Sequence, residues 1–165
     1  MAVELARRHH ERYDGRGYTA GLKGNAIGDF GMIGAIIDHY DAMVSPHVYR
    51  GSHSPYDALK NMYELRNIEF HAALVEQFIQ CMGIYPIGSV VEMNDASVAV
   101  VITTNRTRRL KPRIALVLKP DRTSYDPCRY IDLMRDFEEG SKDALEIRKV
   151  LATGAFDINP TDYLP

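Results

Sequence analysis

Two adjacent histidines and two aspartates in the first third of the chain have the chemistry to bind a metal ion. His9 and His10 are neighbours, and Asp38 and Asp41 follow further along. Nitrogen and oxygen donors without a thiolate suit a divalent ion such as Fe, Mn, Zn or Ni. Histidine pairs also occur as exposed polar residues, or in cores bonded to backbone. The pair alone therefore leaves a metal site and a structural role both open.

A helix over residues 1–11 is expected to carry the two histidines. Leu5 and Ala6 favour a helix, and no N-cap residue precedes the run. Neighbouring residues on a helix are about 100° apart. We therefore expect the rings of His9 and His10 to point in different directions, where each could meet a different metal ion.

A glycine-rich segment, residues 12–29, follows the histidines and contains Tyr18 and Lys23. Its glycines exclude a regular helix and allow the backbone to approach a ligand closely. They are Gly15, Gly17, Gly21, Gly24 and Gly28. A long surface loop is the alternative interpretation of the same glycines.

Residues 30–44 form the clearest predicted helix, because apolar residues recur in it with helical spacing. Asp38 and Asp41 share one face beside the apolar stripe, where an acid is costly unless it is paired or binds a metal. A solvated pair at the margin of the stripe is the alternative. We expect this helix to pack beside helix 1–11, so that His9, His10 and Asp38 converge under the glycine loop. The stripe consists of Ile33, Ile36, Ile37, Tyr40 and Val44.

The remaining chain predicts two more helices and then a β unit. Helices are expected over residues 54–66 and 68–82, followed by a hairpin and a third strand within residues 87–119. Residues 105–113 contain five basic groups and no acid. They predict a solvated hairpin loop, with a phosphate-binding patch as the alternative. Short helices are expected around 129–138 and 141–152.

The predicted fold class is mainly α: a helical bundle fragment followed by a small antiparallel three-stranded β unit. We divide the chain into a helical part at 1–84, the β extension at 85–120 and a helical or irregular tail at 121–165. With 165 residues, this is one domain or one domain with a small extension.

The overall composition argues against several classes of protein. A net charge of -2 gives no general attraction to a nucleic acid polymer or a membrane. Two cysteines, Cys81 and Cys128, suggest neither a disulfide framework nor a zinc site. No run reaches transmembrane length, and the charged N-terminus does not read as a signal peptide. The expected location is the cytoplasm.

The joint pattern is far more specific than its parts. Residues 9–24, HHERYDGRGYTAGLKG, followed by DHYDAM at 38–43 and VYR at 48–50, closely resemble the HD-GYP family. These are bacterial phosphodiesterases of the HD superfamily that hydrolyse cyclic di-GMP. The resemblance covers residues 1–82 and matches the C-terminal half of such a domain. The following β hairpin resembles the small extension that often follows these domains.

The resemblance implies a role for each matching residue. His9, His10 and Asp38 match metal ligands of the family. Asp41 matches the second acid of the motif, near the substrate and a bridging water, and Lys23 matches the loop lysine. We expect catalytic roles for Asp41 and Lys23.

Three further positions match the substrate-binding part of the pattern. Tyr18 is the tyrosine of the signature, and Arg50 matches a basic residue suited to a substrate phosphate. His47 stands at the earlier basic position, although it carries no permanent charge. We expect Tyr18, His47 and Arg50 to bind substrate.

The chain departs from the family pattern in ways that bear on activity. The signature proline is Thr19, and Val48 replaces the proline after the first basic position. No His-Asp pair precedes His9, so the HD dipeptide of the family is absent. With only His9, His10 and Asp38, we expect an incompletely liganded metal centre.

Two functions from different classes follow from this resemblance. The first is a metal-dependent phosphodiesterase acting on cyclic di-GMP in bacterial signalling. The second is a non-catalytic module that binds a cyclic dinucleotide or a diguanylate cyclase partner; a structural remnant without a ligand is a third. Because helix 30–44 is so apolar, we also expect the chain to form a homo-oligomer or to require a complementary N-terminal half.

Overall fold

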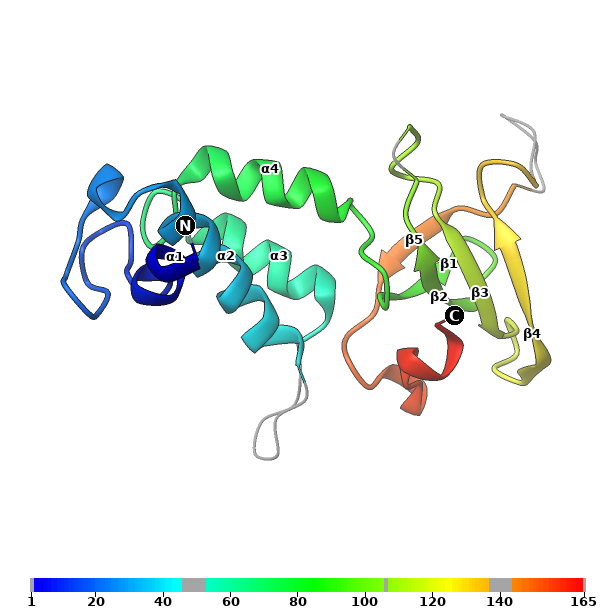
Figure 1. The fold of residues 1–165 in the computed structure, drawn as a ribbon. Helices are drawn as coiled ribbons and strands as arrows, with labels where there is room; N and C mark the ends of the chain where they lie inside the picture. Colours follow the sequence, from blue (N-terminus) through cyan, green and yellow to red (C-terminus); the bar gives the residue numbers. More distant parts are fainter. Residues whose placement is uncertain (1, 46–52, 106, 137–143, 165) are drawn as a thin grey trace. The chain divides into compact units, whose positions relative to one another are not determined.

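The chain folds into two compact units, each described here by itself. The computed structural model describes residues 2–45, 53–105, 107–136 and 144–164. One unit comprises Met1–His53 with Asp57–Cys81, and the other Ser54–Tyr56 with Met82–Pro165. Helices build the first unit and an antiparallel sheet builds the second (Figure 1). The expected order, a helical region followed by a β unit, is confirmed.

The first unit contains four α-helices and a short 3₁₀ helix in its described residues. Gly28, with φ of 76°, separates the 3₁₀ helix from the longest α-helix. Asp29 then lies in the first turn of that helix, where its charge favours the positive end of the helix dipole. The elements are α1 (Ala2–Arg8), η1 (Gly24–Ile27), α2 (Asp29–Val44), α3 (Pro55–Glu64) and α4 (Ala72–Met82).

Two buried glycines on α2 let α1 pack closely against it. A Cβ atom on Gly31 would lie 2.8 Å from Arg8 Cβ, and one on Gly34 would lie 3.1 Å from His9 Cβ. The expected contact between the first helix and helix 30–44 is therefore confirmed.

The buried face of α2 differs from the predicted stripe. Met32, Ala35 and Ile36 are buried, whereas Ile33 is 37% exposed and Ile37 is 51% exposed. The glycines draw α1 onto the face with the smallest side chains, which leaves the bulkier β-branched residues outside.

Helices α3 and α4 are joined to α2 through polar and aromatic contacts. His39 Nε2 lies 3.1 Å from Asn61 Oδ1 on α3, and the ring of Tyr40 packs edge-on against Phe78 of α4 at 5.3 Å between centroids. Burial raises the pKa of Tyr40 to about 12. The half-buried Tyr40 hydroxyl therefore stays neutral at neutral pH.

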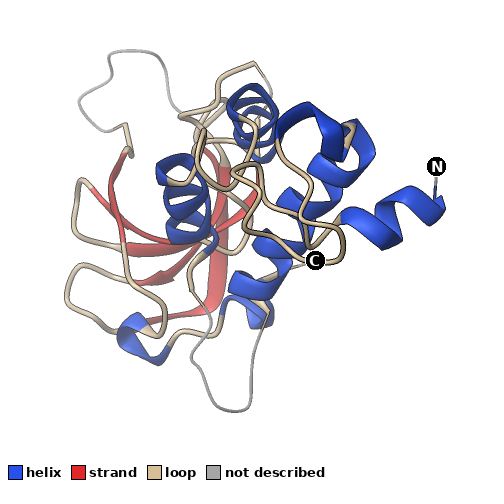
Figure 2. Cartoon of the chain, turned by 90° about the vertical axis from the view of Figure 1, so that its left-hand side faces the viewer, coloured by secondary structure: helices blue, strands red, loops and turns tan. Residues whose placement is uncertain are grey.

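The second unit is a five-stranded antiparallel sheet in the order β4-β3-β2-β1-β5, where three strands were expected (Figures 1 and 2). The three expected strands form its centre. The two additional strands lie at the edges, so the helices predicted around 129–138 and 141–152 are wrong at residues 129–132 and 147–150. The strands are β1 (Val90–Met93), β2 (Val98–Thr103), β3 (Arg113–Leu118), β4 (Ser124–Asp132) and β5 (Ile147–Val150).

Both faces of the sheet are covered, which explains why its central strands are almost continuously apolar. One face forms a cluster around Val91, Val101 and Leu116. The other packs around Val100 and receives Ile158 from the C-terminal segment, where η2 (Ala155–Asp157) and η3 (Pro160–Tyr163) lie.

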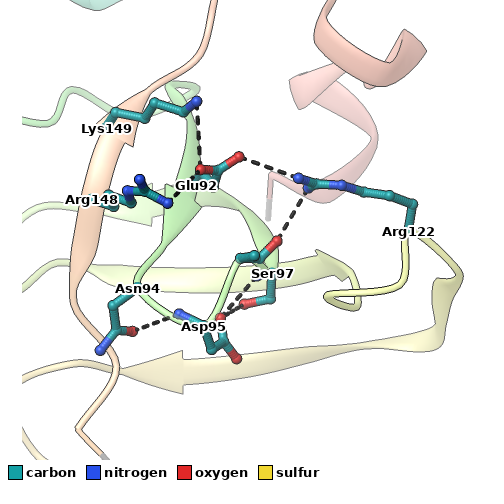
Figure 3. A network of polar contacts seen from close by, with 8 residues as sticks. Glu92, Asn94, Asp95, Ser97, Arg122, Arg148 and Lys149 are labelled. Atoms are coloured by element: carbon teal, nitrogen blue, oxygen red, sulfur yellow. Dashed lines mark hydrogen bonds and ion pairs between the residues drawn. The ribbon is translucent and has the colours of Figure 1, made fainter.

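One carboxylate in this sheet, that of Glu92, is surrounded by three cations (Figure 3). Its oxygens lie 3.3 Å from Arg122, 3.5 Å from Lys149 and 3.8 Å from Arg148. Burial alone would raise the pKa of Glu92, but the hydrogen bond from Arg122 and the charge of Lys149 outweigh it, and the pKa lies below its ordinary value. The cluster ties the β3–β4 turn and β5 to β1.

Candidate functional site

His9 and His10 lie in the turn that follows α1, because the helix ends at Arg8 rather than at residue 11. Their rings are in contact, with centroids 3.9 Å apart and planes inclined by 43°. The expectation that the rings point apart is therefore wrong for the rings as a whole, which lie side by side, although their Nδ1 atoms have different partners. The turn breaks the 100° helical spacing on which that expectation depended.

His10 faces Asp38 of α2 across the contact between the two helices. His10 Nδ1 lies 3.9 Å from Asp38 Oδ2, and both side chains are partly exposed. A nitrogen and a carboxylate oxygen at this separation, open to solvent, fit the donor set of a divalent metal ion.

His9 is oriented differently from His10. His9 Nδ1 lies 3.1 Å from the carbonyl oxygen of Leu5, within hydrogen-bond distance of the helix backbone. Within the described residues, no group of three His, Cys, Asp or Glu side chains is close enough to hold one ion. The structure thus brings His10 and Asp38 together but does not complete a three-ligand cluster with His9.

Tyr18 lies over the ring of His10. The two rings are stacked at 4.5 Å with an angle of 24° between their planes, and Tyr18 is 65% exposed. The glycine loop therefore contacts His10 through an aromatic side chain, while closure of the loop over the gap between the two helices stays a prediction.

Glu11 is a residue of this site to which the sequence analysis gave no role. It is 1% exposed, and its two carboxylate oxygens accept hydrogen bonds from the backbone N–H groups of Ala20 at 2.7 Å and Leu22 at 2.9 Å. The sequence does contain a signal for this role. Glu11 is an acid next to two candidate ligands, and it precedes a glycine-rich loop whose backbone N–H groups need hydrogen-bond acceptors.

Gly17 and Thr19 give the loop its path. A Cβ atom on Gly17 would lie 2.3 Å from Arg12 N, so only glycine fits there. Thr19 has φ of 129°, and its hydroxyl donates to the carbonyl oxygen of Arg7 at 2.9 Å. The chain thus passes over the end of α1 in direct contact with its backbone.

The other predicted site residues lie around this centre or outside the described part. Lys23 is exposed and precedes η1, and Asp41 is exposed one turn beyond Asp38, where it accepts a hydrogen bond from Ser45 Oγ at 3.3 Å. His47 and Arg50 lie outside the described residues.

Comparison with known families matches this site to a described domain. Residues 2–73, a range that includes every predicted site residue, match a family described as an HD domain. The chain thus contains an HD domain, and the motif within it is of the HD-GYP type. Its HD domain lies in the N-terminal part of the chain, and residues 90–138 match a family described as a KOW domain associated with HD domain.

Three curated relatives of this chain are named as phosphodiesterases, two of cyclic di-GMP and one of 3'3'-cGAMP. A cyclic di-GMP phosphodiesterase of Pseudomonas aeruginosa is 30% identical over 135 residues, 82% of this chain and 32% of that protein. A cyclic di-GMP phosphodiesterase of Vibrio cholerae is 40% identical over 79 residues, 48% of this chain and 16% of that protein. A 3'3'-cGAMP-specific phosphodiesterase of the same organism is 46% identical over 54 residues, 33% of this chain and 12% of that protein.

The alignments differ in how much of the chain and of each relative they cover. The chain spans about a third or less of the length of the relatives named above. An alignment of 135 residues extends beyond the helical unit into the β unit, so the Pseudomonas protein shares sequence with both. Within the described residues, no helix is long and apolar enough to cross a membrane.

Proposed function

We propose that this HD domain takes part in the metal-dependent hydrolysis of a cyclic dinucleotide, with cyclic di-GMP as substrate. The observation that carries the proposal is the approach of His10 to Asp38, two residues that match the family pattern, at 3.9 Å on the open side of the α1–α2 contact. The names of the relatives support the substrate.

In this proposal the metal-binding residues are His10 and Asp38, with His9 beside them. A divalent ion such as Fe, Mn, Zn or Ni, when bound, would lower the pKa of a coordinated water and polarise the phosphodiester. With Nδ1 bonded to the Leu5 carbonyl oxygen, 3.1 Å away, His9 would offer Nε2 to the metal.

The substrate lies, in this proposal, along the exposed side of the same centre. Asp41 orients the attacking water, since it is one turn from Asp38 on the same helix. Tyr18 offers an exposed aromatic face to a guanine base. Lys23, His47 and Arg50 supply charge or hydrogen bonds to the phosphates.

A second candidate function is binding of a cyclic dinucleotide, or of a diguanylate cyclase domain, without hydrolysis. It is favoured by the absence of a third ligand near His10 and Asp38 within the described residues, and by Thr19 and His47, which depart from the family pattern. This candidate predicts nucleotide affinity without turnover.

Metal analysis and a hydrolysis assay separate these two functions. For residues 1–165 alone we expect a bound divalent metal, cyclic di-GMP binding, and weak conversion to the linear dinucleotide or none. His10→Ala should release the metal, whereas His53→Ala, which removes an exposed histidine elsewhere, should retain it.

The outcomes distinguish the proposals clearly. Metal-dependent turnover that is lost in His10→Ala establishes the phosphodiesterase. Nucleotide binding with metal but without turnover supports the binding module. Metal content that is unchanged in both His10→Ala and Asp38→Ala contradicts the site itself.

A further inference from the structure

Both carboxylate oxygens of Glu11 accept hydrogen bonds from the backbone of the glycine loop. The side chain is almost completely buried, where a charge is unfavourable unless hydrogen bonds satisfy it. Its Oε1 accepts from Ala20 N–H at 2.7 Å and its Oε2 from Leu22 N–H at 2.9 Å. Hydrogen bonds to an ionised acceptor are roughly twice as strong as neutral ones. The loop is therefore anchored by one side chain at two points.

Further contacts hold the same loop against the turn that carries the histidines. Tyr18 N–H donates to the carbonyl oxygen of His10 at 3.2 Å, and Thr19 Oγ1 donates to that of Arg7 at 2.9 Å. Gly21, with φ of 64°, lies between the two residues bonded to Glu11 and allows both N–H groups to face one carboxylate. The loop is thus hydrogen-bonded to α1 and to the turn that follows it at more than one point.

The anchored loop determines what lies against His10. The His10 ring is stacked with that of Tyr18 at 4.5 Å and also contacts the ring of His9 at 3.9 Å between centroids. These two contacts restrict the ring, whose Nδ1 lies 3.9 Å from Asp38 Oδ2. Tyr18 itself is largely exposed, so little besides the loop backbone keeps it in place.

We propose that Glu11 is a positioning residue: by anchoring the loop, it keeps Tyr18 on His10 and fixes the His10 ring toward Asp38. The link to metal affinity rests on the proposed function, whereas the link to the Tyr18–His10 contact does not. Replacing a residue that orients a metal ligand without binding the metal itself typically lowers metal affinity by about 10- to 100-fold.

Glu11→Gln is the direct test, since glutamine has the same shape but turns an NH₂ group toward one of the two backbone N–H donors. We expect the nuclear Overhauser contacts between the Tyr18 and His10 rings to disappear. The dissociation constant for Zn²⁺, measured by titration calorimetry, should rise about 10- to 100-fold. Glu76→Gln, the same change at an exposed position of α4, should alter neither.

Tyr18→Leu tests the same proposal if Glu11→Gln fails to fold. It leaves Glu11 and its two hydrogen bonds in place but removes the ring from His10, and we expect it to weaken Zn²⁺ binding as well. Ring contacts and Zn²⁺ affinity that persist in Glu11→Gln, or affinity that is unchanged in Tyr18→Leu, would overturn the positioning role. If the wild-type protein binds no Zn²⁺, the metal site fails, while the ring contacts still decide whether Glu11 positions Tyr18.

Discussion

Thr19 shows how one residue that departs from a family signature fits its own backbone. The signature has proline at this position, and proline fixes φ near −65°. Thr19 instead has φ of 129°, and its hydroxyl bonds the Arg7 carbonyl oxygen. The threonine therefore suits the backbone conformation that the loop has at this position.

Restoring the signature proline should consequently harm this protein. Thr19→Pro forces a change in φ and removes the hydroxyl, and we expect a loss of about 1–3 kcal/mol in unfolding free energy, measured with urea. Thr19→Gly loses the same hydroxyl but tolerates the positive φ, so it serves as the matched control and should cost less. Equal or greater stability of Thr19→Pro would show that the loop takes another path.

Glu92 provides a prediction with a defined pH dependence. Its folded-state pKa is lowered from 4.5, so its contribution to stability is present above that value and is lost as the pH falls through the lower folded-state pKa. Glu92→Gln should therefore lower the melting temperature at about pH 7, and the difference from wild type should shrink below about pH 4. Calorimetry at both pH values measures it; a difference that grows toward acid would contradict the assigned cation contacts.

At the scale of elements, the glycines of α2 explain where α1 lies. Gly31 and Gly34 are three residues apart and so share one face of the helix. That face is the one against which Arg8 and His9 pack. The placement of His10 near Asp38 thus depends on two positions without side chains.

Gly31→Ala should separate these helices. The added Cβ would lie 2.8 Å from both Arg8 Cβ and Ile27 Cγ2, and overpacking of this kind costs about 1–3 kcal/mol. Alanine recovers about 1 kcal/mol through its higher helix propensity. We expect a net loss of about 1 kcal/mol in denaturant unfolding, with a smaller change for Gly34→Ala, whose contacts begin at 3.1 Å. A net gain for Gly31→Ala would contradict the close contact.

The sequence predicted the helical part and the central strands because their patterns are strong. The apolar run of Val98–Thr103 and the helical spacing in residues 30–44 leave little choice of element. The edge strands were missed because β4, SYDPCRYID, is largely exposed and carries a proline, so its pattern is weak.

For the candidate site, the motif predicted the nearness of His10 and Asp38 but not the orientation of the rings. Ring orientation depends on where α1 ends and on the path of the glycine loop. Those features come from close contacts, at Gly17 and at Glu11, that no spacing in the sequence displays.

At the scale of the whole molecule, the exposed side of α2 raises the question of what covers it. Phe30 is 44% exposed, Ile33 37% and Ile37 51%, and their spacing places them along one side of the helix. Leaving such side chains in water forgoes about 1.5–3 kcal/mol each, and a contiguous patch of this kind typically marks an interface. We therefore predict that a second copy of the chain covers it.

Sedimentation at low micromolar concentration tests this prediction. The wild-type chain should form a dimer or larger species, and Ile37→Glu should dissociate it, because a charge would then have to be buried between two copies of α2. Ile68→Glu is the matched control: Ile68 has nearly the same exposure, 52%, but lies outside α2, so this variant should assemble like the wild type. A wild-type chain that remains a monodisperse monomer and melts cooperatively would contradict self-association, and would show that α2 tolerates its apolar side in water.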